Sequence, residues 1–135
     1  AAKTVKPSAL NFAPGCDINA STKRTSTFKA TKTGLLNNLS ISTFKSAYPD
    51  AELQVTISAD GSDQPLKLFT VNADKLSWSP KNLVLHPNIK VTAGKTYTIS
   101  ISSNTSKGCY GLEYDRATKD SAEPAFLYKA DIVNR

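Results

Sequence analysis

The sequence predicts an all-β fold, an antiparallel β-sandwich of the jelly-roll type with eight or nine strands. Three observations support this. Residues 96–102 alternate apolar and hydroxyl side chains with a period of two, which is typical of a strand with one buried and one solvated face. Turn signals containing Gly or Pro recur along the whole chain at short spacing. Long stretches with the apolar repeat of an α-helix are missing.

The predicted strands follow one another with short connections, as they do in antiparallel sandwiches. In chain order they cover residues 25–31, 35–46, 51–59, 65–73, 81–87, 95–103, 109–115 and 124–133. The segment 81–87 contains a short continuous apolar run at 83–85, so we expect it at the centre of a sheet. The best helical candidate, residues 116–126, contains Pro124, which stops a helix after about two turns.

The phase of the plainest strand indicates which of its side chains are buried. Tyr97, Ile99 and Ile101 share one face and are expected in the core, while the intervening Thr and Ser side chains face water. The strand carries no group suited to catalysis. We therefore expect it to be scaffold, with recognition left to the loops that it supports.

The length of 135 residues predicts one domain. Residues 1–15 resemble a linker that enters this domain, so we expect the domain to cover residues 16–135 and to be part of a longer protein. No apolar run approaches the roughly 20 residues needed to cross a bilayer, and residues 1–15 lack the apolar core of a signal peptide. The sequence therefore predicts a soluble domain with no membrane partner.

The net charge of +6 is carried by 14 Lys and only 3 Arg. Arg binds phosphate through two parallel hydrogen bonds, whereas Lys is a solvated point charge, so this balance disfavours dedicated nucleic-acid binding. The densest basic strip spans residues 23–32. We interpret it as an edge strand that Lys protects against aggregation, with binding of an anionic polymer as the alternative.

The two cysteines, Cys16 and Cys109, are each preceded by a glycine at the boundary of a predicted element. We expect a disulfide that ties the first segment to a late strand; two separate buried thiols are the alternative. A disulfide implies an oxidising compartment, and hence secretion. Closing so long a loop adds stability on the order of 4 kcal/mol through the entropy of the unfolded chain.

Nothing in the sequence predicts catalysis. His86 is the only histidine, and it ends an apolar run, where a local hydrogen bond is a more ordinary role than that of a base. The acidic residues fall in turns, as in 50–52 and 60–63, and the six glycines are scattered singly, so neither a carboxylate pair nor a phosphate loop stands out. We expect no enzyme activity and no cofactor. A structural calcium ion is conceivable, but no ligand spacing supports one.

Residues 25–130 carry a family resemblance in the order of their segments. The chain resembles galactose-binding-like jelly-roll modules, which are non-catalytic appendages of secreted polysaccharide-degrading enzymes such as glycoside hydrolases. The segments that carry the resemblance are "STFKATKTGLLNNLSISTF", "YPDAELQVTISADGSDQP", "LVLHPNIKVTAGKTYTISISS" and "CYGLEYD". The resemblance implies a secreted carbohydrate-binding module attached to a catalytic domain, with a polysaccharide or oligosaccharide as its ligand. The chain departs from the family at residues 112–114, where many relatives carry a Trp.

Sugars offer an apolar ring face and a rim of hydroxyls, which proteins bind with flat aromatic rings and a few polar side chains. Trp78, flanked by serines, is the strongest single candidate. Tyr110 and Tyr114 could share a strand face, beside a carboxylate and a guanidinium. The predicted ligand-binding set is Trp78, Tyr110, Tyr114, Asp115 and Arg116. Tyr48, in the turn "AYPD", is a further candidate for an exposed ring.

Two other classes of function remain open. The domain could be an adhesion module or a structural spacer that binds no sugar, or it could bind an anionic polymer through the strip 23–32. Salt dependence separates the last class, because counterion release makes the affinity for a polyanion fall steeply with ionic strength. A blank result on a broad glycan array would favour the spacer.

Overall fold

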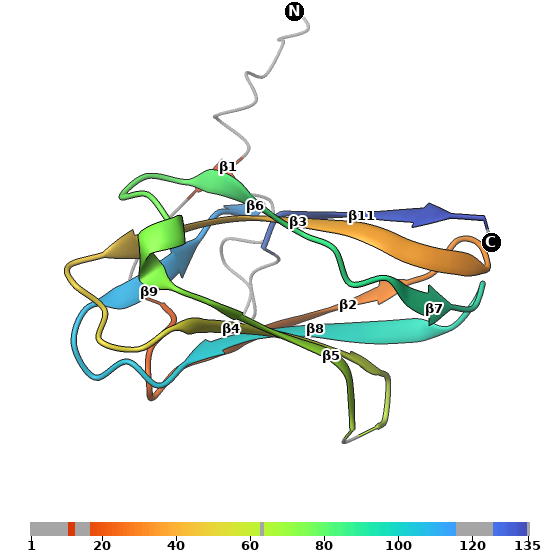
Figure 1. Cartoon of the computed structure of the whole chain (residues 1–135), viewed down its shortest axis with the longest axis horizontal. Helices are drawn as coiled ribbons and strands as arrows, with labels where there is room; N and C mark the ends of the chain where they lie inside the picture. The colour runs from red at the N-terminus through yellow and green to blue at the C-terminus, as the bar shows by residue number, and fades with distance from the viewer. Residues whose placement is uncertain (1–10, 13–16, 63, 116–125, 135) are drawn as a thin grey trace, which may run out of the picture.

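The computed structural model describes residues 11–12, 17–62, 64–115 and 126–134. It confirms the predicted all-β fold: the described residues form antiparallel sheets that pack face to face as a sandwich (Figure 1). Within the described residues, the regular structure consists of eleven strands, three of them only two or three residues long, and one short 3-10 helix. No helix among the described residues is long and apolar enough to cross a membrane.

The first sheet has four strands in the order β2-β8-β4-β5. These are β2 (Arg24–Lys29), β8 (Thr96–Ser103), β4 (Leu53–Ala59) and β5 (Pro65–Val71). Central pairs such as Ile57 opposite Ile99 place β-branched side chains of neighbouring strands together on the inner face. Strand β2 lies at the edge of the sheet, which confirms the predicted edge strand within the Lys-rich strip.

The second sheet is organised around one long strand, β3 (Gly34–Ser46). Along one side of β3 lie β11 (Tyr128–Val133) and then β9 (Cys109–Leu112). Along the other side lie β7 (Ile89–Val91) and then β6 (Lys81–Leu85). The sheet therefore contains five strands but is only three strands wide at any point of β3.

A small third sheet joins β1 (Asn11–Phe12) to β10 (Tyr114–Asp115). Residues 11–12, which fall within the predicted linker 1–15, therefore pair with a strand of the domain. Further along the chain, Ile18 and Tyr110 exchange two backbone hydrogen bonds of 3.0 Å, so the segment around Ile18 runs beside β9. The predicted helical candidate 116–126 lies outside the described residues, apart from Phe126.

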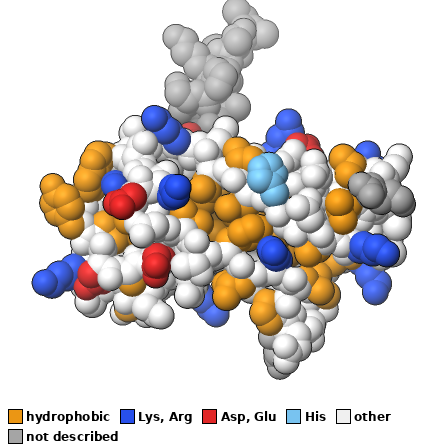
Figure 2. Space-filling view, in the orientation of Figure 1, with side chains coloured by type: hydrophobic (Ala, Val, Ile, Leu, Met, Phe, Trp, Pro, Cys, Tyr) orange, Lys and Arg blue, Asp and Glu red, His pale blue; other side chains and the backbone are white. Residues whose placement is uncertain are grey.

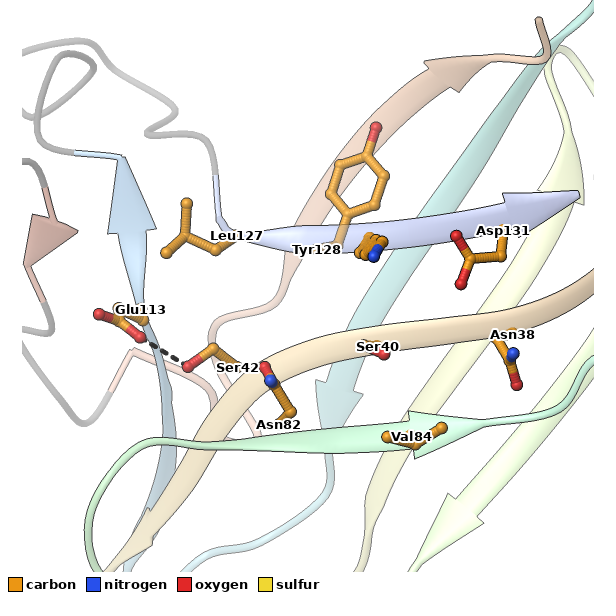
Figure 3. Close-up of a pocket in the computed structure, with 10 residues that line it drawn as sticks. Asn38, Ser40, Ser42, Asn82, Val84, Glu113, Leu127, Tyr128 and Asp131 are labelled. Carbon is orange, nitrogen blue, oxygen red and sulfur yellow. Dashed lines mark hydrogen bonds between the residues drawn. The ribbon is translucent and has the colours of Figure 1, made fainter. Parts of the chain in front are cut away.

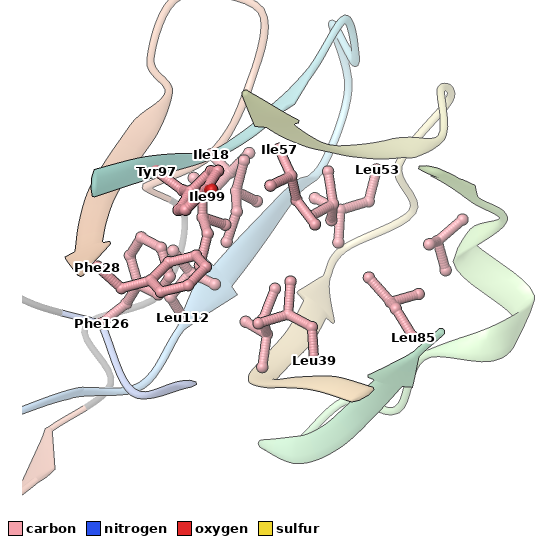
Figure 4. Close-up of a cluster of buried hydrophobic side chains, with 14 of the residues drawn as sticks. Ile18, Phe28, Leu39, Leu53, Ile57, Leu85, Tyr97, Ile99, Leu112 and Phe126 are labelled. Atoms are coloured by element: carbon pink, nitrogen blue, oxygen red, sulfur yellow. The ribbon is translucent and has the colours of Figure 1, made fainter. Parts of the chain in front are cut away.

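The core fills the space between the two large sheets (Figure 4). Tyr97, Ile99 and Ile101 are buried, as predicted from their phase. The Tyr97 ring stacks on Phe28 with centroids 5.6 Å apart, and its hydroxyl accepts a hydrogen bond from the Thr92 backbone at 2.8 Å. The largest other side chains that are completely buried include Ile18, Leu36, Leu39, Ile57 and Leu112.

The prediction that residues 81–87 form a central strand is wrong. Among the described residues β6 pairs with β3 alone, and Val84 is 50% exposed. A continuous apolar run does not distinguish a strand covered on both faces from an edge strand. The run ends at Asn88, which adopts a positive φ of 53° and donates its backbone N–H to Leu36. This turn leads into β7, a strand that was not predicted.

Gly111 on β9 allows a close approach to its partner on β3. A Cβ atom at Gly111 would lie 2.3 Å from the ring of Phe44, the residue opposite it. The missing side chain therefore leaves room for Phe44 to lie flat across the neighbouring strand. This contact covers the outer face of the second sheet at its β9 end, where Phe44 is buried.

Candidate binding surfaces

The structure does not bring the predicted site residues together on the surface. Tyr110 and Tyr114 are 0% and 1% exposed and belong to the hydrophobic core. The Tyr110 hydroxyl donates to the carbonyl of Ala51 at 2.6 Å, and burial, together with the charges of Glu52 and Asp50, raises its pKa to about 12. Neither ring has a face to offer to a ligand, so both are removed from the candidate site.

The remaining three predicted residues have different positions. Asp115 is half-buried on β10, opposite Asn11. Arg116 lies outside the described residues. Trp78, in the connection between β5 and β6, is 55% exposed, which leaves it as the one aromatic of the predicted set that is open to solvent.

A second exposed ring stands beside Trp78. Tyr48, in the turn between β3 and β4, is 81% exposed and meets Trp78 edge to face, with ring centroids 5.3 Å apart and an interplanar angle of 80°. We refer to Tyr48 and Trp78 as the aromatic pair. Tyr48 was predicted only as a further candidate, because the turn "AYPD" does not reveal which ring it will meet.

Lys45, near the end of β3, contacts Trp78 and the segment that carries it. Its backbone N–H donates to the Ser77 carbonyl at 2.9 Å, which fixes the residue next to Trp78. Its Nζ atom donates to the Ala73 carbonyl at 3.0 Å and lies 4.7 Å from the centroid of the Trp78 ring. This cation–π contact orders an indole that would otherwise be free to rotate in solvent.

A polar hollow of about 300 Å³, which we call the loop-end pocket, adjoins the aromatic pair. It lies where the connections after β3 and β5 meet, and its wall begins at Pro49, directly after Tyr48. Its lining residues are Pro49, Asp50, Ala51, Glu52, Asn72 and Ala73. Figure 2 shows hydrophobic side chains gathered at this end of the molecule, close to acidic and basic ones. The pocket is near the lower size limit of small-molecule sites.

A hydrogen-bond network around Asp50 makes this end of the sandwich rigid. The carboxylate accepts hydrogen bonds from the Ser106 backbone at 2.8 Å and the Ser106 hydroxyl at 2.7 Å, and it contacts the Thr105 hydroxyl at 2.9 Å. These bonds hold the pKa of Asp50 well below its usual range, with the Ser106 hydroxyl as the largest cause. Asp50 therefore stays ionised and locks the loop before β9 against the turn that carries Tyr48.

A larger hollow of about 450 Å³ lies on the outer face of the second sheet (Figure 3). We call it the sheet groove. Its lining residues are Asn38, Ser40, Ser42, Asn82, Val84, Glu113, Leu127, Tyr128, Lys129 and Asp131. The Ser42 hydroxyl donates to Glu113 at 2.7 Å. The outward side chains of the predicted strand 35–46 were not among the predicted site residues.

The described residues place no three His, Cys, Asp or Glu side chains together as metal ligands. His86 is exposed, and its Nδ1 lies 3.4 Å from the carbonyl oxygen of Asn37 on the neighbouring strand β3, so its partner is not a sequence neighbour as predicted. Cys109 is buried, and no described cysteine is free. Because Cys16 lies outside the described residues, the Cys16–Cys109 disulfide stays a prediction.

Comparison with known proteins found no protein-family model that matches this sequence and no match among curated proteins. The fold and the geometry of its surfaces therefore carry the functional argument.

Proposed function

We propose that this domain is a non-catalytic carbohydrate-binding module, and that the aromatic pair with the loop-end pocket is its binding site. The observation that carries the proposal is the exposure of Tyr48 and Trp78 side by side on a rigid end of the sandwich. Single exposed apolar residues are ordinary on protein surfaces, but two large rings exposed side by side form a contiguous patch, and such patches mark interaction sites.

The chemistry around the aromatic pair suits a sugar. An aromatic face covers the C–H side of a sugar ring, and charged or amide groups at its margin bind the hydroxyls. Glu52 and Asn72 supply such groups in the loop-end pocket, and Lys45 adds an ammonium beside Trp78. The rigid support of Asp50 reduces the entropy that binding would otherwise cost.

The proposal extends to the setting of the domain. We propose that it is secreted, that a Cys16–Cys109 disulfide ties its N-terminal segment to β9, and that it targets an attached polysaccharide-degrading enzyme to its substrate. The paired backbones of Ile18 and Tyr110 support the disulfide, because they bring the two cysteine-bearing segments side by side. The family resemblance of the sequence supports the attached enzyme.

A glycan array followed by titration of a hit tests the binding site. Trp78→Ala and Tyr48→Ala should each weaken binding by roughly 1–3 kcal/mol, because the lost ring contact is made only in the complex. Their melting temperatures should hardly change, since both rings are exposed. Leu68→Ala is the matched control: Leu68 is 52% exposed on β5 and lies outside both the aromatic pair and the loop-end pocket.

A blank array across neutral and acidic glycans would overturn the proposal and favour a structural spacer. Binding that falls steeply with salt would instead indicate an anionic polymer. Hydrolysis of a polysaccharide by the purified domain, lost on mutation of one carboxylate, would contradict the non-catalytic part of the proposal.

A further inference from the structure

We propose that the sheet groove is a second carbohydrate site, which binds a neutral oligosaccharide lying lengthwise along β3. It takes the same class of ligand as the proposed function but contains none of the residues of the aromatic pair or the loop-end pocket. Its shape, its hydrogen-bonding groups and its charge each support this assignment.

The strand register produces the shape of the groove. Small side chains, Ser40 and Ser42, lie on the central strand and form the floor. Opposite Ser40 stand the longer Lys129 on β11 and the bulkier, branched Val84 on β6, which form the two banks. Because neighbouring strands lie about 4.8 Å apart, short side chains between long ones leave a trough parallel to the strand.

The trough is long enough for a chain of sugars. The groove extends along β3 from Asn38 to Ser42, which is about 13 Å along an extended strand. Asp131 and Asn38 lie at one end, while Glu113 and Leu127 lie at the other (Figure 3). A single small solute would leave much of this length empty, so an extended ligand matches the groove better.

The groove offers hydrogen-bonding groups that the protein itself does not use. Among the described residues, the side chains of Asn38, Asn82 and Asp131 make no hydrogen bond to the protein, and all three line the groove. Two amides and a carboxylate provide both donors and acceptors, which is what a ligand rich in hydroxyls requires. The Ser42–Glu113 hydrogen bond holds a further carboxylate at the end of the floor.

The local charge selects against anionic polymers. The groove is lined by two carboxylates, Glu113 and Asp131, and one ammonium, Lys129, whereas the whole chain carries a net charge of +6. A polyanion attracted to the protein would therefore bind this groove less favourably than the more basic parts of the surface. The groove lies on the face of the sheet between paired strands, so a ligand in it would bind through side chains and would not add a strand. A neutral oligosaccharide fits these constraints.

The two proposed sites would act together on a polymer. The groove floor and Lys45, which contacts Trp78, belong to the same strand, β3. A polysaccharide held at both places would dissociate more slowly than a short oligosaccharide held at one, because the second contact becomes intramolecular.

The experiment follows the side-chain amide signals of Asn38 and Asn82 by NMR while soluble β-glucan and β-mannan oligosaccharides are added. We expect these two signals to shift on addition of a bound oligosaccharide. Ser40→Tyr, which fills the trough with an outward-pointing ring, should weaken this binding about tenfold or more. Ser100→Tyr is the matched control, because Ser100 has the corresponding outward position on the central strand β8 of the other sheet.

The outcomes separate the two sites. If the groove signals still shift in Trp78→Ala but not in Ser40→Tyr, the groove is confirmed independently of the aromatic pair. If Trp78→Ala abolishes all binding and Ser40→Tyr changes nothing, the proposed function stands and the groove proposal is overturned. Shifts from no oligosaccharide would overturn the groove proposal as well. Should Ser40→Tyr fail to fold, the double variant Asn38→Ala, Asn82→Ala gives the same test by affinity measurement.

Discussion

The two outer faces of the sandwich are built from similar side chains but have different surfaces. On the four-stranded sheet, short hydroxyl side chains stand opposite one another across three strands, as in the row Thr25, Ser100 and Thr56. On the second sheet the central strand also presents serines, but its neighbours present Lys129, Asp131 and Asn82. Rows of equal height make an even surface, whereas short side chains between long ones make a groove.

This difference shows that composition alone does not determine a binding surface. The alternation of apolar and polar side chains decides which residues face solvent, and it does so similarly in both sheets. The height of each outward residue relative to its cross-strand neighbours depends on strand pairing, which brings together residues as distant as Ser40 and Lys129. The following tests compare the two sheets directly.

The largest expected effect concerns the link between the N-terminal segment and the second sheet. If Cys16 and Cys109 form the proposed disulfide, reduction should lower the free energy of unfolding by about 4 kcal/mol, because the unfolded chain regains the entropy of an open loop. Thermal melts with and without reductant measure this. Two titratable thiols in the unfolded, unreduced protein would contradict the disulfide.

A truncation in the first sheet should show that its two faces contribute unequally to stability. Ile99 is completely buried, so Ile99→Ala should lower the free energy of unfolding by about 2–5 kcal/mol through a cavity in the core. Its outward neighbour provides the control: Ser100→Ala should stay within about 0.5 kcal/mol. Denaturant titration of both variants makes the comparison, and equal losses would contradict the assignment of faces.

In the second sheet, the close contact between Gly111 and Phe44 should be sensitive to a single added methyl group. Gly111→Ala places a Cβ atom 2.3 Å from the nearest atom of the Phe44 ring, and this clash should lower the free energy of unfolding by about 1–3 kcal/mol. In a Phe44→Ala background this cost should largely disappear, because the ring is gone. A double-mutant cycle measures the coupling. If the two changes are additive, the ring does not constrain position 111.

The smallest expected effect is the pH dependence of stability, in which Asp50 and Asp17 should act in opposite directions. The pKa of Asp50 is lowered, so its contribution is present above about pH 4 and is lost as the pH falls through its folded value. Burial raises the pKa of Asp17, and Arg24, whose Nε lies 3.6 Å from Oδ2 of Asp17, offsets only part of this increase. The contribution of Asp17 to stability is therefore present below about pH 4 and is lost as the pH rises.

Denaturant titrations across the acid range, repeated with Asp50→Asn and Asp17→Asn, separate these two contributions. Asp50→Asn should flatten the loss of stability toward low pH, because the group that must remain ionised is gone. Asp17→Asn should raise stability near neutrality relative to acid, because no buried charge is then required. If the free energy of unfolding falls toward low pH as steeply in Asp50→Asn as in the original protein, the hydrogen bonds of Asp50 do not contribute to stability.

The sequence predicted the strands well because their signals are local. Gly and Pro turns bound them, and an alternating phase assigned Tyr97, Ile99 and Ile101 to the core. The same reasoning failed for Val84, because an apolar run looks alike at the centre and at the edge of a sheet. It failed also for Tyr110 and Tyr114, whose burial depends on Ile18 and other segments far along the chain.

For the candidate binding surfaces, too, some features follow from the sequence alone and others only from the tertiary structure. The sequence by itself determined that the domain is all-β and which face of strand 96–102 turns inward, and it singled out Trp78 as a candidate for the binding surface. Only the tertiary structure decided that Tyr48 meets Trp78 and that the serines of β3 lie between longer side chains of β11 and β6. Backbone conformation and alternation are properties of neighbouring residues, whereas a binding surface is formed by residues that only long-range strand pairing brings together.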